Sequence, residues 1–356
     1  MAKRNKSTKK GPFWLKVVIS LALIIIISGG IAAFRLYHAI FESNVYLGGE
    51  QTTHIYIPTG SDFEDVQTIL SENGLLINPN TFNWLAEKKN YKENIRPGRY
   101  LIAEDMSNNR LINMLRSGDQ DPVRLTFNNI RLKEQLAGVM ASNIEADSTS
   151  IINLLNDEIA MEEFGFNPQT SKLLFIPNTY EIFWNTSAEQ LLERMYREYN
   201  SFWNRDRIAK AEEMNMTPVQ VAILASIVQM ETSRPDEFRR IAGVFINRLR
   251  RNIPLQADPT VIFAVGDFTI RRVLNRHLEV DSPYNTYRNT GLPPGPISVP
   301  EPRVIDAVLN YENHGYIFFA AREDFSGYHA FAETYREHRI NARRFHNALN
   351  QRGIMR

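Results

Sequence analysis

The chain has 356 residues, 43% of them hydrophobic and 23% charged, which is enough to bury the cores of two or more folded units. It contains no cysteine, which excludes disulfides, thiolate zinc sites and a cysteine nucleophile but leaves the redox compartment open. The formal net charge is +1, yet six of the 41 basic residues lie within the first 16 residues. The remainder is therefore mildly acidic, which argues against nucleic acid as the main partner.

The N-terminus predicts a membrane anchor. Residues 1–12 form a basic tail, and residues 13–35 read as a transmembrane helix, because Val17–Phe34 is an uncharged, mostly apolar run of 18 residues. The basic tail predicts that the N-terminus is cytoplasmic and that the rest of the chain lies outside. The alternative is a cleaved signal peptide, but the run is long for that and residues 31–34 make a poor cleavage site.

A small module is expected at residues 53–118. Its patterns predict a strand, two helices and a return strand, with a further helix after them. The first of these helices is expected to begin with a capping box between Ser61 and Glu64. The expected ranges are 54–57, 61–73, 80–89, 98–102 and 108–116. A unit this small fits an accessory module better than an enzyme core.

Residues 119–356 predict a larger domain of mixed helices and strands, so the expected fold class is α+β. Strands are predicted at 123–127, 316–320 and 329–331, and helices at 132–143, 149–156, 188–203, 304–311 and 334–350. Between them, residues 254–302 are rich in proline, glycine, asparagine and tyrosine and show little periodicity. A loop this long inside a compact domain is usually functional.

The strongest candidate for chemistry is Glu231. Thr217 and Gln220 predict a capping box at the start of a helix that runs to about residue 231. Leu224, Ile227, Val228 and Glu231 share one face of that helix, so the glutamate continues an apolar stripe. Burial and the negative end of the helix dipole would both raise its pKa, as a general acid requires. The alternative is a structural glutamate paired with Arg234, Arg239 or Arg240.

Several separated segments resemble the endolytic murein transglycosylases, the YceG-like family. They follow one another in the family's order between about residues 173 and 345. The segments are Ala225–Thr232, Ile241–Leu249, Pro254–Ile262, Ser282–Tyr287, Gly291–Ile297 and His329–Phe331, with Thr334, Glu337 and His338 downstream.

The resemblance implies a single transmembrane anchor, a LysM-like module and an α+β catalytic domain, which match the ranges 13–35, 53–118 and 119–356. It implies an enzyme of the bacterial inner membrane whose catalytic domain lies on the periplasmic side. Such an enzyme would cut nascent glycan strands between N-acetylmuramic acid and N-acetylglucosamine and leave 1,6-anhydro ends. Peptidoglycan strands would be its substrate, peptidoglycan synthases are candidate partners, and no cofactor is implied.

By resemblance, Glu231 is both the acid and the base of this reaction. Ordinary glycosidases use two carboxylates, but an attack by the sugar's own 6-hydroxyl needs neither a protein nucleophile nor a positioned water. Polar and loop residues of the neighbouring segments are expected to bind sugar. These are Asn247, Gln256, Asp258, Tyr284, Asn285, Gly291 and Leu292, although Asp258 suits a structural turn equally well.

Two other interpretations stay open. A hydrolytic muramidase could use the same glutamate with water, and an inactive wall-binding scaffold would not cleave at all. The spacing of His329 and His338 fits no strong zinc motif, so no metal is expected.

The chain also departs from the family, with Gln229 where a glutamate is frequent and Asn178 in place of an aspartate. Ser171 and Lys172 stand where the family has a Glu-Gly pair before this motif, Pro177–Tyr180. These differences put in doubt an acidic role for the motif.

Overall fold

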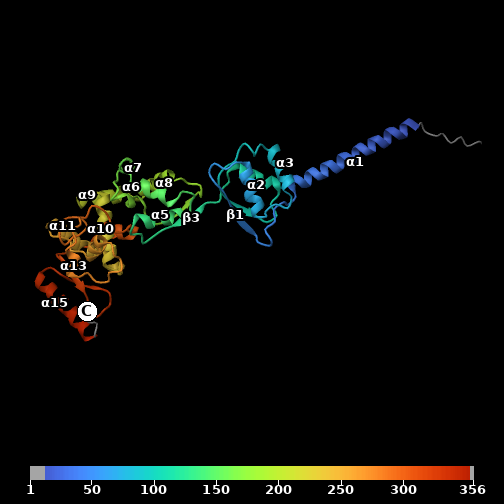
Figure 1. Cartoon of the computed structure of the whole chain (residues 1–356). Helices are drawn as coiled ribbons and strands as arrows, with labels where there is room; N and C mark the ends of the chain where they lie inside the picture. The colour runs from blue at the N-terminus through green and yellow to red at the C-terminus, as the bar shows by residue number, and fades with distance from the viewer. Residues whose placement is uncertain (1–12, 353–356) are drawn as a thin grey trace, which may run out of the picture. The chain divides into compact units, whose positions relative to one another are not determined.

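The computed structural model describes residues 13–352 and consists of helices with three short antiparallel strand pairs. The predicted basic tail lies outside the described residues. The chain divides into two compact units. The first holds residues up to Pro122 together with 183–185, and the second holds 123–182 and everything from Thr186 onward. In Figure 1 the first unit runs from blue to cyan-green and the second from green to red.

The first unit begins with helix α1(Phe13–Phe41), which is 29 residues long. It is the one helix of the described chain that is long and apolar enough to cross a membrane, and none of its residues is buried. It extends beyond the predicted end at residue 35 and is joined to the module by hydrogen bonds. The Asn108 amide donates to Ala39 O at 2.9 Å, and the Asn44 amide donates to Asn108 Oδ1 at 2.7 Å.

The module has the predicted order of strand, two helices, strand and a further helix, and its likeness to LysM stays a prediction. The elements are β1(Thr52–Ile57), α2(Phe63–Glu72), α3(Pro79–Lys88), β2(Gly98–Ala103) and α4(Asn108–Ser117). The strands pair antiparallel, with Ile55 opposite Tyr100. Both side chains are buried because alternate positions of each strand face the helices.

The predicted capping box at Ser61 is displaced by one residue. Asp62 is the N-cap, and its carboxylate accepts from Asp65 N at 3.0 Å while Asp65 Oδ2 accepts from Asp62 N at 2.9 Å. An aspartate caps a helix as well as a serine does, and the pair Asp62–Asp65 has the same three-residue spacing as the predicted pair. The helix therefore begins at Phe63.

The second unit contains the remaining elements. Its strand pairs are β3(Val123–Thr126) with β4(Thr179–Ile182) and β5(Phe318–Ala321) with β6(His329–Ala332), both antiparallel. Its helices are α5(Lys133–Ala141), α6(Ser148–Asn156), α7(Glu158–Glu163), η1(Ser171–Leu174), α8(Ala188–Phe202), α9(Arg205–Glu213), α10(Pro218–Glu231), η2(Pro235–Glu237), α11(Phe238–Arg250), α12(Asp258–Val265), α13(Asn275–Leu278), α14(Pro302–Leu309) and α15(Tyr335–Gln351).

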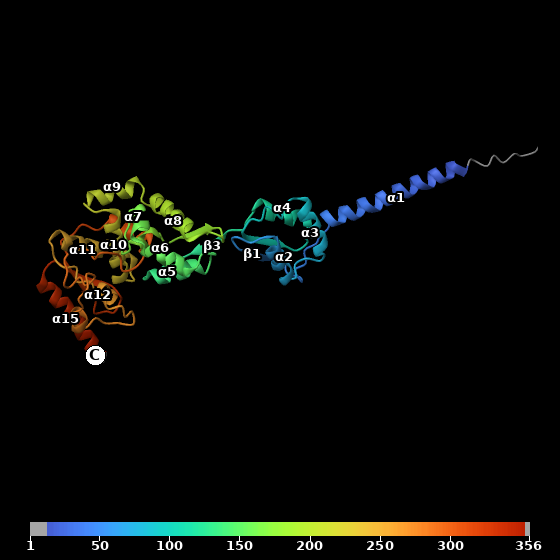
Figure 2. The same ribbon diagram turned by 45° about the horizontal axis from the view of Figure 1, so that its top comes forward.

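Helix α10 is the centre of the second unit. It contacts α9, α11, α12 and α14, and its label lies among those of the surrounding helices in Figures 1 and 2. The predicted capping box is confirmed, since Thr217 N donates to Gln220 Oε1 at 2.8 Å and Gln220 N donates to Thr217 Oγ1 at 3.2 Å. The prediction of a single apolar stripe is too narrow, because every residue from Val221 to Val228 is buried.

The predicted long loop at 254–302 is interrupted by two short helices. Pro259 occupies the first turn of α12, where its missing N–H costs no hydrogen bond, and Gly266 ends the helix with a φ of 79°. The rest of the segment is irregular and lies on the C-terminal side of α10. Hydrogen bonds from α10 hold it there, because Ser226 Oγ accepts from Ile297 N at 3.0 Å and Gln229 Oε1 accepts from Glu301 N at 2.7 Å.

Candidate active site

Glu231 is the last residue of α10 and is half-buried. Its carboxyl makes no hydrogen bond or ion pair with any of the described residues. Burial, and secondarily repulsion from Asp258, raises the pKa of Glu231 to about 8. The carbonyl end of the helix dipole acts in the same direction. The end of α10 therefore carries a carboxylic acid that is mostly protonated at neutral pH and has no protein partner.

The arginines that follow Glu231 in the sequence do not pair with it. Arg239 Nε donates to Asn310 O at 2.5 Å, and Arg240 Nε lies 3.0 Å from a carboxylate oxygen of Glu312. Arg234 bonds the backbone carbonyl of Ser326. The alternative in which Glu231 is a structural partner of one of these arginines is therefore wrong.

Asp258 and Tyr287 form the second part of the site. Tyr287 Oη donates to Asp258 Oδ1 at 2.6 Å, and Asp258 is exposed at the start of α12. Burial raises the pKa of Tyr287 far above its usual value, and the bond to Asp258 adds to the shift. Charge interactions link Glu231 to both residues, so the three groups share one site. It contains one neutral acid, one exposed carboxylate and one phenol that stays protonated.

Arg248 and Gln256 shape the loop before α12. Arg248 is 6% exposed, and its guanidinium donates to Leu255 O at 2.9 Å and to Gln256 Oε1 at 2.7 Å. Burial lowers the pKa of Arg248 from its usual value. Gln256 is exposed and has a φ of 54°, a backbone conformation that only an imposed loop shape makes a glutamine adopt. Its backbone N–H donates to Thr286 O at 3.0 Å, which ties this loop to the next one.

The segment around residues 282–295 is held by its own polar groups. Asn285 is fully buried, and its amide donates to Leu278 O and Val280 O at 2.9 Å, so it shapes the loop instead of facing solvent. The half-buried ring of Tyr284 lies 4.8 Å from that of Phe263. Gly291, with a φ of 84°, and Leu292 are half-buried.

Asn247 lies on α11 and braces the approach to β5. Its amide donates to His314 O at 2.7 Å and to Tyr316 O at 3.0 Å. Both amide hydrogens are therefore used within the protein. Of the residues predicted to bind sugar, only Asn285 is fully buried; the other six, Asn247, Gln256, Asp258, Tyr284, Gly291 and Leu292, keep exposed or half-buried surface.

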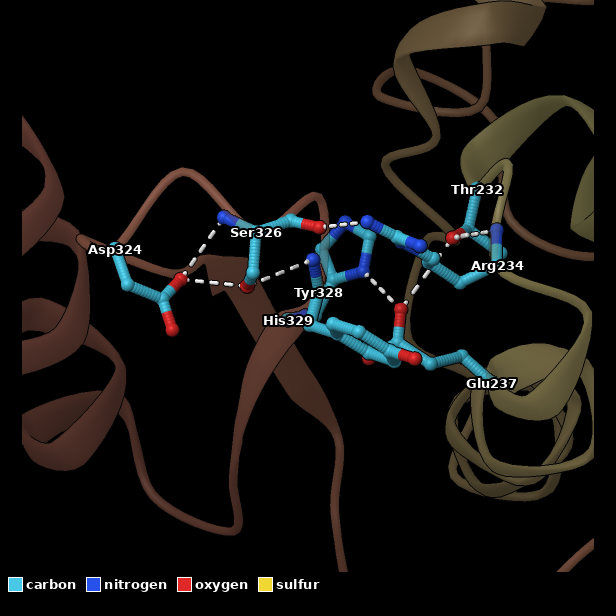
Figure 3. A network of polar contacts seen from close by, with 7 residues as sticks. All are labelled: Thr232, Arg234, Glu237, Asp324, Ser326, Tyr328 and His329. Carbon is cyan, nitrogen blue, oxygen red and sulfur yellow. Dashed lines mark hydrogen bonds and ion pairs between the residues drawn. The ribbon is translucent and has the colours of Figure 1, made fainter.

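A polar network leads from the end of α10 to the hairpin β5–β6, as Figure 3 shows. Thr232, the residue after Glu231, donates to Glu237 Oε2 at 3.3 Å. Glu237 is 4% exposed and also accepts from His329 N at 2.9 Å and pairs with His329 Nδ1 at 2.8 Å. Arg234 accompanies this network, with its guanidinium 4.7 Å from the centroid of the Tyr328 ring. The network fixes the chain that follows α10 against the hairpin.

No group of three or more His, Asp or Glu side chains in the described residues is placed to hold a metal ion. His329 is engaged with Glu237, and the ring of His338 stacks at 5.1 Å on Phe318. Burial lowers the pKa of His338, which disfavours its charged form.

Sequence reasoning singled out neither Tyr287 nor Arg248. Both lie inside segments that carry the family resemblance, but the neighbouring Tyr284 and Asn285 looked equally suited to sugar. The role of a tyrosine hydroxyl depends on the group to which it is hydrogen-bonded. For Tyr287 that group is the Asp258 carboxylate, which is 29 residues away in the sequence. The sequence also did not indicate that Lys172 is buried. It is 5% exposed, and its Nζ donates to Arg131 O at 2.7 Å.

Comparison with known proteins places these features in context. The sequence model of the YceG-like family matches residues 55–344. A Bacillus subtilis protein named endolytic murein transglycosylase is 27% identical over 333 residues, which covers 89% of this chain and 91% of the relative. A Streptococcus pneumoniae protein of the same name is 24% identical over 338 residues, and the match covers 86% of this chain but 60% of that relative. A crystal structure of a YceG-like protein from Listeria monocytogenes matches with a TM-score of 0.53 at 27% identity, covering 82% of this chain and 98% of that one.

Proposed function

This chain belongs to the YceG-like family, and on that premise we propose that it is an endolytic murein transglycosylase. The substrate is the glycan strand of peptidoglycan, cut between N-acetylmuramic acid and N-acetylglucosamine. The observation that carries the proposal is the unpartnered acid at the end of α10, whose pKa of about 8 leaves it protonated at neutral pH. A group with a pKa of 8 is about nine-tenths protonated at pH 7.

The proposed reaction uses the carboxyl group of Glu231 twice, first as an acid and then as a base. Glu231 donates its proton to the glycosidic oxygen while the bond from that oxygen to C1 of N-acetylmuramic acid breaks. The carboxylate that results then accepts the proton of the 6-hydroxyl of the same sugar as its oxygen bonds to C1. The product is a 1,6-anhydro ring, no water is added, and Glu231 ends protonated as it began.

Asp258 and Tyr287 support this chemistry electrostatically. The Asp258 carboxylate disfavours the anion of Glu231 and so helps to keep the acid loaded before cleavage. The same charge stabilises the positive charge that develops at C1 as the bond breaks. The hydrogen bond of 2.6 Å from Tyr287 holds this carboxylate in place without neutralising it.

We assign sugar contacts to Gln256, Tyr284, Gly291 and Leu292, which keep accessible surface around Asp258. The amide hydrogens of Asn247 and Asn285 are already donated to backbone carbonyls. Those two asparagines therefore position the loops that carry the sugar contacts. An exposed Gln256 amide can donate to a hydroxyl or acetamido oxygen, since Arg248 occupies only its Oε1.

The same proposal includes a place in the cell. Helix α1 anchors the chain in the bacterial inner membrane, and the second unit works on the periplasmic side, as the basic residues before α1 imply. The module of residues 53–118 binds glycan as a LysM-like unit. Glycan strands newly made beside the membrane are then the accessible substrate, and peptidoglycan synthases are the proposed partners.

The experiment is digestion of purified glycan strands by the full chain in detergent micelles, followed by mass spectrometry of the ends. The expected new ends are one water lighter than hydrolysed ends, and Glu231→Gln abolishes them. Ends that carry a water, traced with ¹⁸O-labelled solvent, would instead show a hydrolytic muramidase. Strand binding without cleavage by the unaltered chain would favour an inactive scaffold.

A further inference from the structure

A small cavity, walled mostly by hydrophobic residues but with a partly polar accessible lining, adjoins α10 and α12. Its volume is about 150 Å³, and its walls include Met230, Pro259, Phe263, Phe268 and Ile297, with Arg131 as the charged member. We call it the side cavity. Met230 directly precedes Glu231, and Pro259 directly follows Asp258. Two walls of the side cavity are therefore the immediate neighbours of the two carboxylates of the site.

Of the described residues that line the side cavity, Arg131 is the one with a charged side chain. The Arg131 guanidinium lies over the Phe268 ring, 5.1 Å from its centroid, and makes no ion pair or hydrogen bond within residues 13–352. Lys172 Nζ lies 4.9 Å from the centroid of Phe263, but burial lowers the pKa of Lys172 to about 7, so it carries only part of a positive charge at neutral pH. A half-buried guanidinium without an acidic partner favours a ligand that brings a carboxylate.

The size of the side cavity limits what part of a glycan can enter. A cavity of about 150 Å³ accommodates a group of the size of benzene. A pyranose ring with its hydroxyls is larger and would leave those hydroxyls without partners against aromatic walls. A short substituent with a methyl group and a carboxyl group fits both the walls and the charge.

We propose that the side cavity binds the D-lactyl substituent of the N-acetylmuramic acid that is cleaved, with Arg131 bonding its carboxyl group. This inference rests on the proposed function and names the part of the substrate that fixes where the cut falls. N-acetylglucosamine carries no lactyl group, so it leaves the walls unfilled and Arg131 unpaired. The side cavity thus selects muramic acid for the position next to Glu231.

The lactyl carboxyl differs between two natural forms of the strand. In strands without stem peptides it is a free carboxylate and forms a charge-assisted bond with Arg131. In strands with stem peptides it is an amide, which offers only a neutral carbonyl. Because a carboxylate adds the attraction of a full negative charge that an amide carbonyl lacks, Arg131 matters more for peptide-free strands.

The test compares Arg131→Gln with the unaltered full chain on both strand types from one preparation. We expect kcat/KM on peptide-free strands to fall about tenfold or more, and on peptide-bearing strands about threefold or less. Arg131→Lys should recover part of the loss on peptide-free strands. The matched control is Arg124→Gln, an exposed arginine on β3, which should leave both values unchanged. Equal losses on both strand types would overturn the inference.

A binding measurement separates this inference from the proposed function. In a Glu231→Gln background, in which strands stay intact, adding Arg131→Gln should weaken binding of peptide-free strands by a similar factor. It should leave binding of N-acetylglucosamine oligomers unchanged. Absence of cleavage by the unaltered chain would sink the proposed function alone, whereas unchanged strand binding in the double variant would sink the side-cavity inference alone.

Discussion

His329 contacts both carboxylate oxygens of Glu237, with its backbone N–H 2.9 Å from Oε1 and its ring Nδ1 2.8 Å from Oε2. The two residues are 92 positions apart in sequence, and Glu237 is 4% exposed. Thr232 shares Oε2, so the residue after Glu231 is bonded to the same carboxylate. The orientation of Glu231, the proposed catalytic acid, therefore depends on the buried pair of Glu237 and His329.

Replacing Glu237 tests this dependence. Glu237→Gln keeps the shape but loses the charge, and we expect it to destabilise the protein by about 2–3 kcal/mol, since an altered buried pair leaves its partner unsatisfied. The melting temperature should fall, and kcat should fall as Thr232 loses its acceptor. Thermal denaturation and strand-cleavage assays measure the two effects. Asp324→Asn at the exposed end of the same network is the control and should change stability by less than about 0.5 kcal/mol.

The pH dependence of cleavage should follow the titration of Glu231. Glu231 must be protonated to donate, and its pKa is raised to about 8, so kcat/KM should fall tenfold for each pH unit well above 8. Asp258 contributes to that shift by repulsion, so Asp258→Asn should move the alkaline limb to lower pH. Rates measured on peptide-free strands from about pH 3 to 10 give the alkaline limb of the unaltered chain and that of Asp258→Asn. An alkaline limb centred near 4.5 would contradict the assignment.

The same raised pKa predicts that Glu231 destabilises the fold at neutral pH. Its pKa is about 8 in the folded protein and 4.5 in its ordinary state, so the unfolded chain loses this proton first as pH rises. The contribution of the Glu231 carboxyl to the free energy of unfolding is therefore fully present below pH 4.5. It is lost progressively as the pH rises to about 8. We expect Glu231→Gln to raise stability by about 1–3 kcal/mol at pH 8. The gain should shrink toward zero at pH 4.5 in paired denaturant titrations.

Tyr287→Phe removes the hydrogen bond of 2.6 Å to Asp258 while keeping the ring. A carboxylate that is no longer held in place stabilises charge at C1 less well, so kcat should fall about tenfold or more with a smaller change in KM. The matched control is Tyr196→Phe, because the Tyr196 ring packs at 5.1 Å on Phe164 away from the site. A loss confined to KM would show that Tyr287 binds sugar instead of orienting Asp258.

How much of this site is readable from sequence depends on how far apart the partners lie. The capping box of Thr217 and Gln220, the helix and its terminal Glu231 are local signals, and they are predicted correctly. The partners of Glu237 and Asp258 lie 92 and 29 residues away, and only the folded chain brings them together. Position alone therefore could not separate Tyr287 from Tyr284.

The helices that the sequence did not predict are also those whose local signals are weak. Helix α9 is not predicted, because Ala211 is its only buried residue and its polar surface carries no apolar period. The helix α12 is hidden within a segment of turn-forming residues, where Asp258-Pro259 reads as a turn as readily as a helix start. Tertiary packing against α10 decides in favour of the helix.

Two glycines in helices provide a final test of how closely the second unit is packed. In α11, a Cβ added at Gly243 would lie 2.4 Å from Glu312 O and 2.7 Å from His314 Nε2, so the backbone of the 312–314 segment must move. In α5, a Cβ at Gly138 would meet nothing within 4 Å.

Gly138→Ala should therefore stabilise the protein by about 0.5–1 kcal/mol through helix propensity. Gly243→Ala should instead destabilise it by about 1–3 kcal/mol through overpacking. It should also weaken the hold of Asn247 on His314 O, and with it the approach to β5. Melting curves of the two variants should shift in opposite directions, and a higher melting temperature in both would show that the 312–314 segment yields without cost.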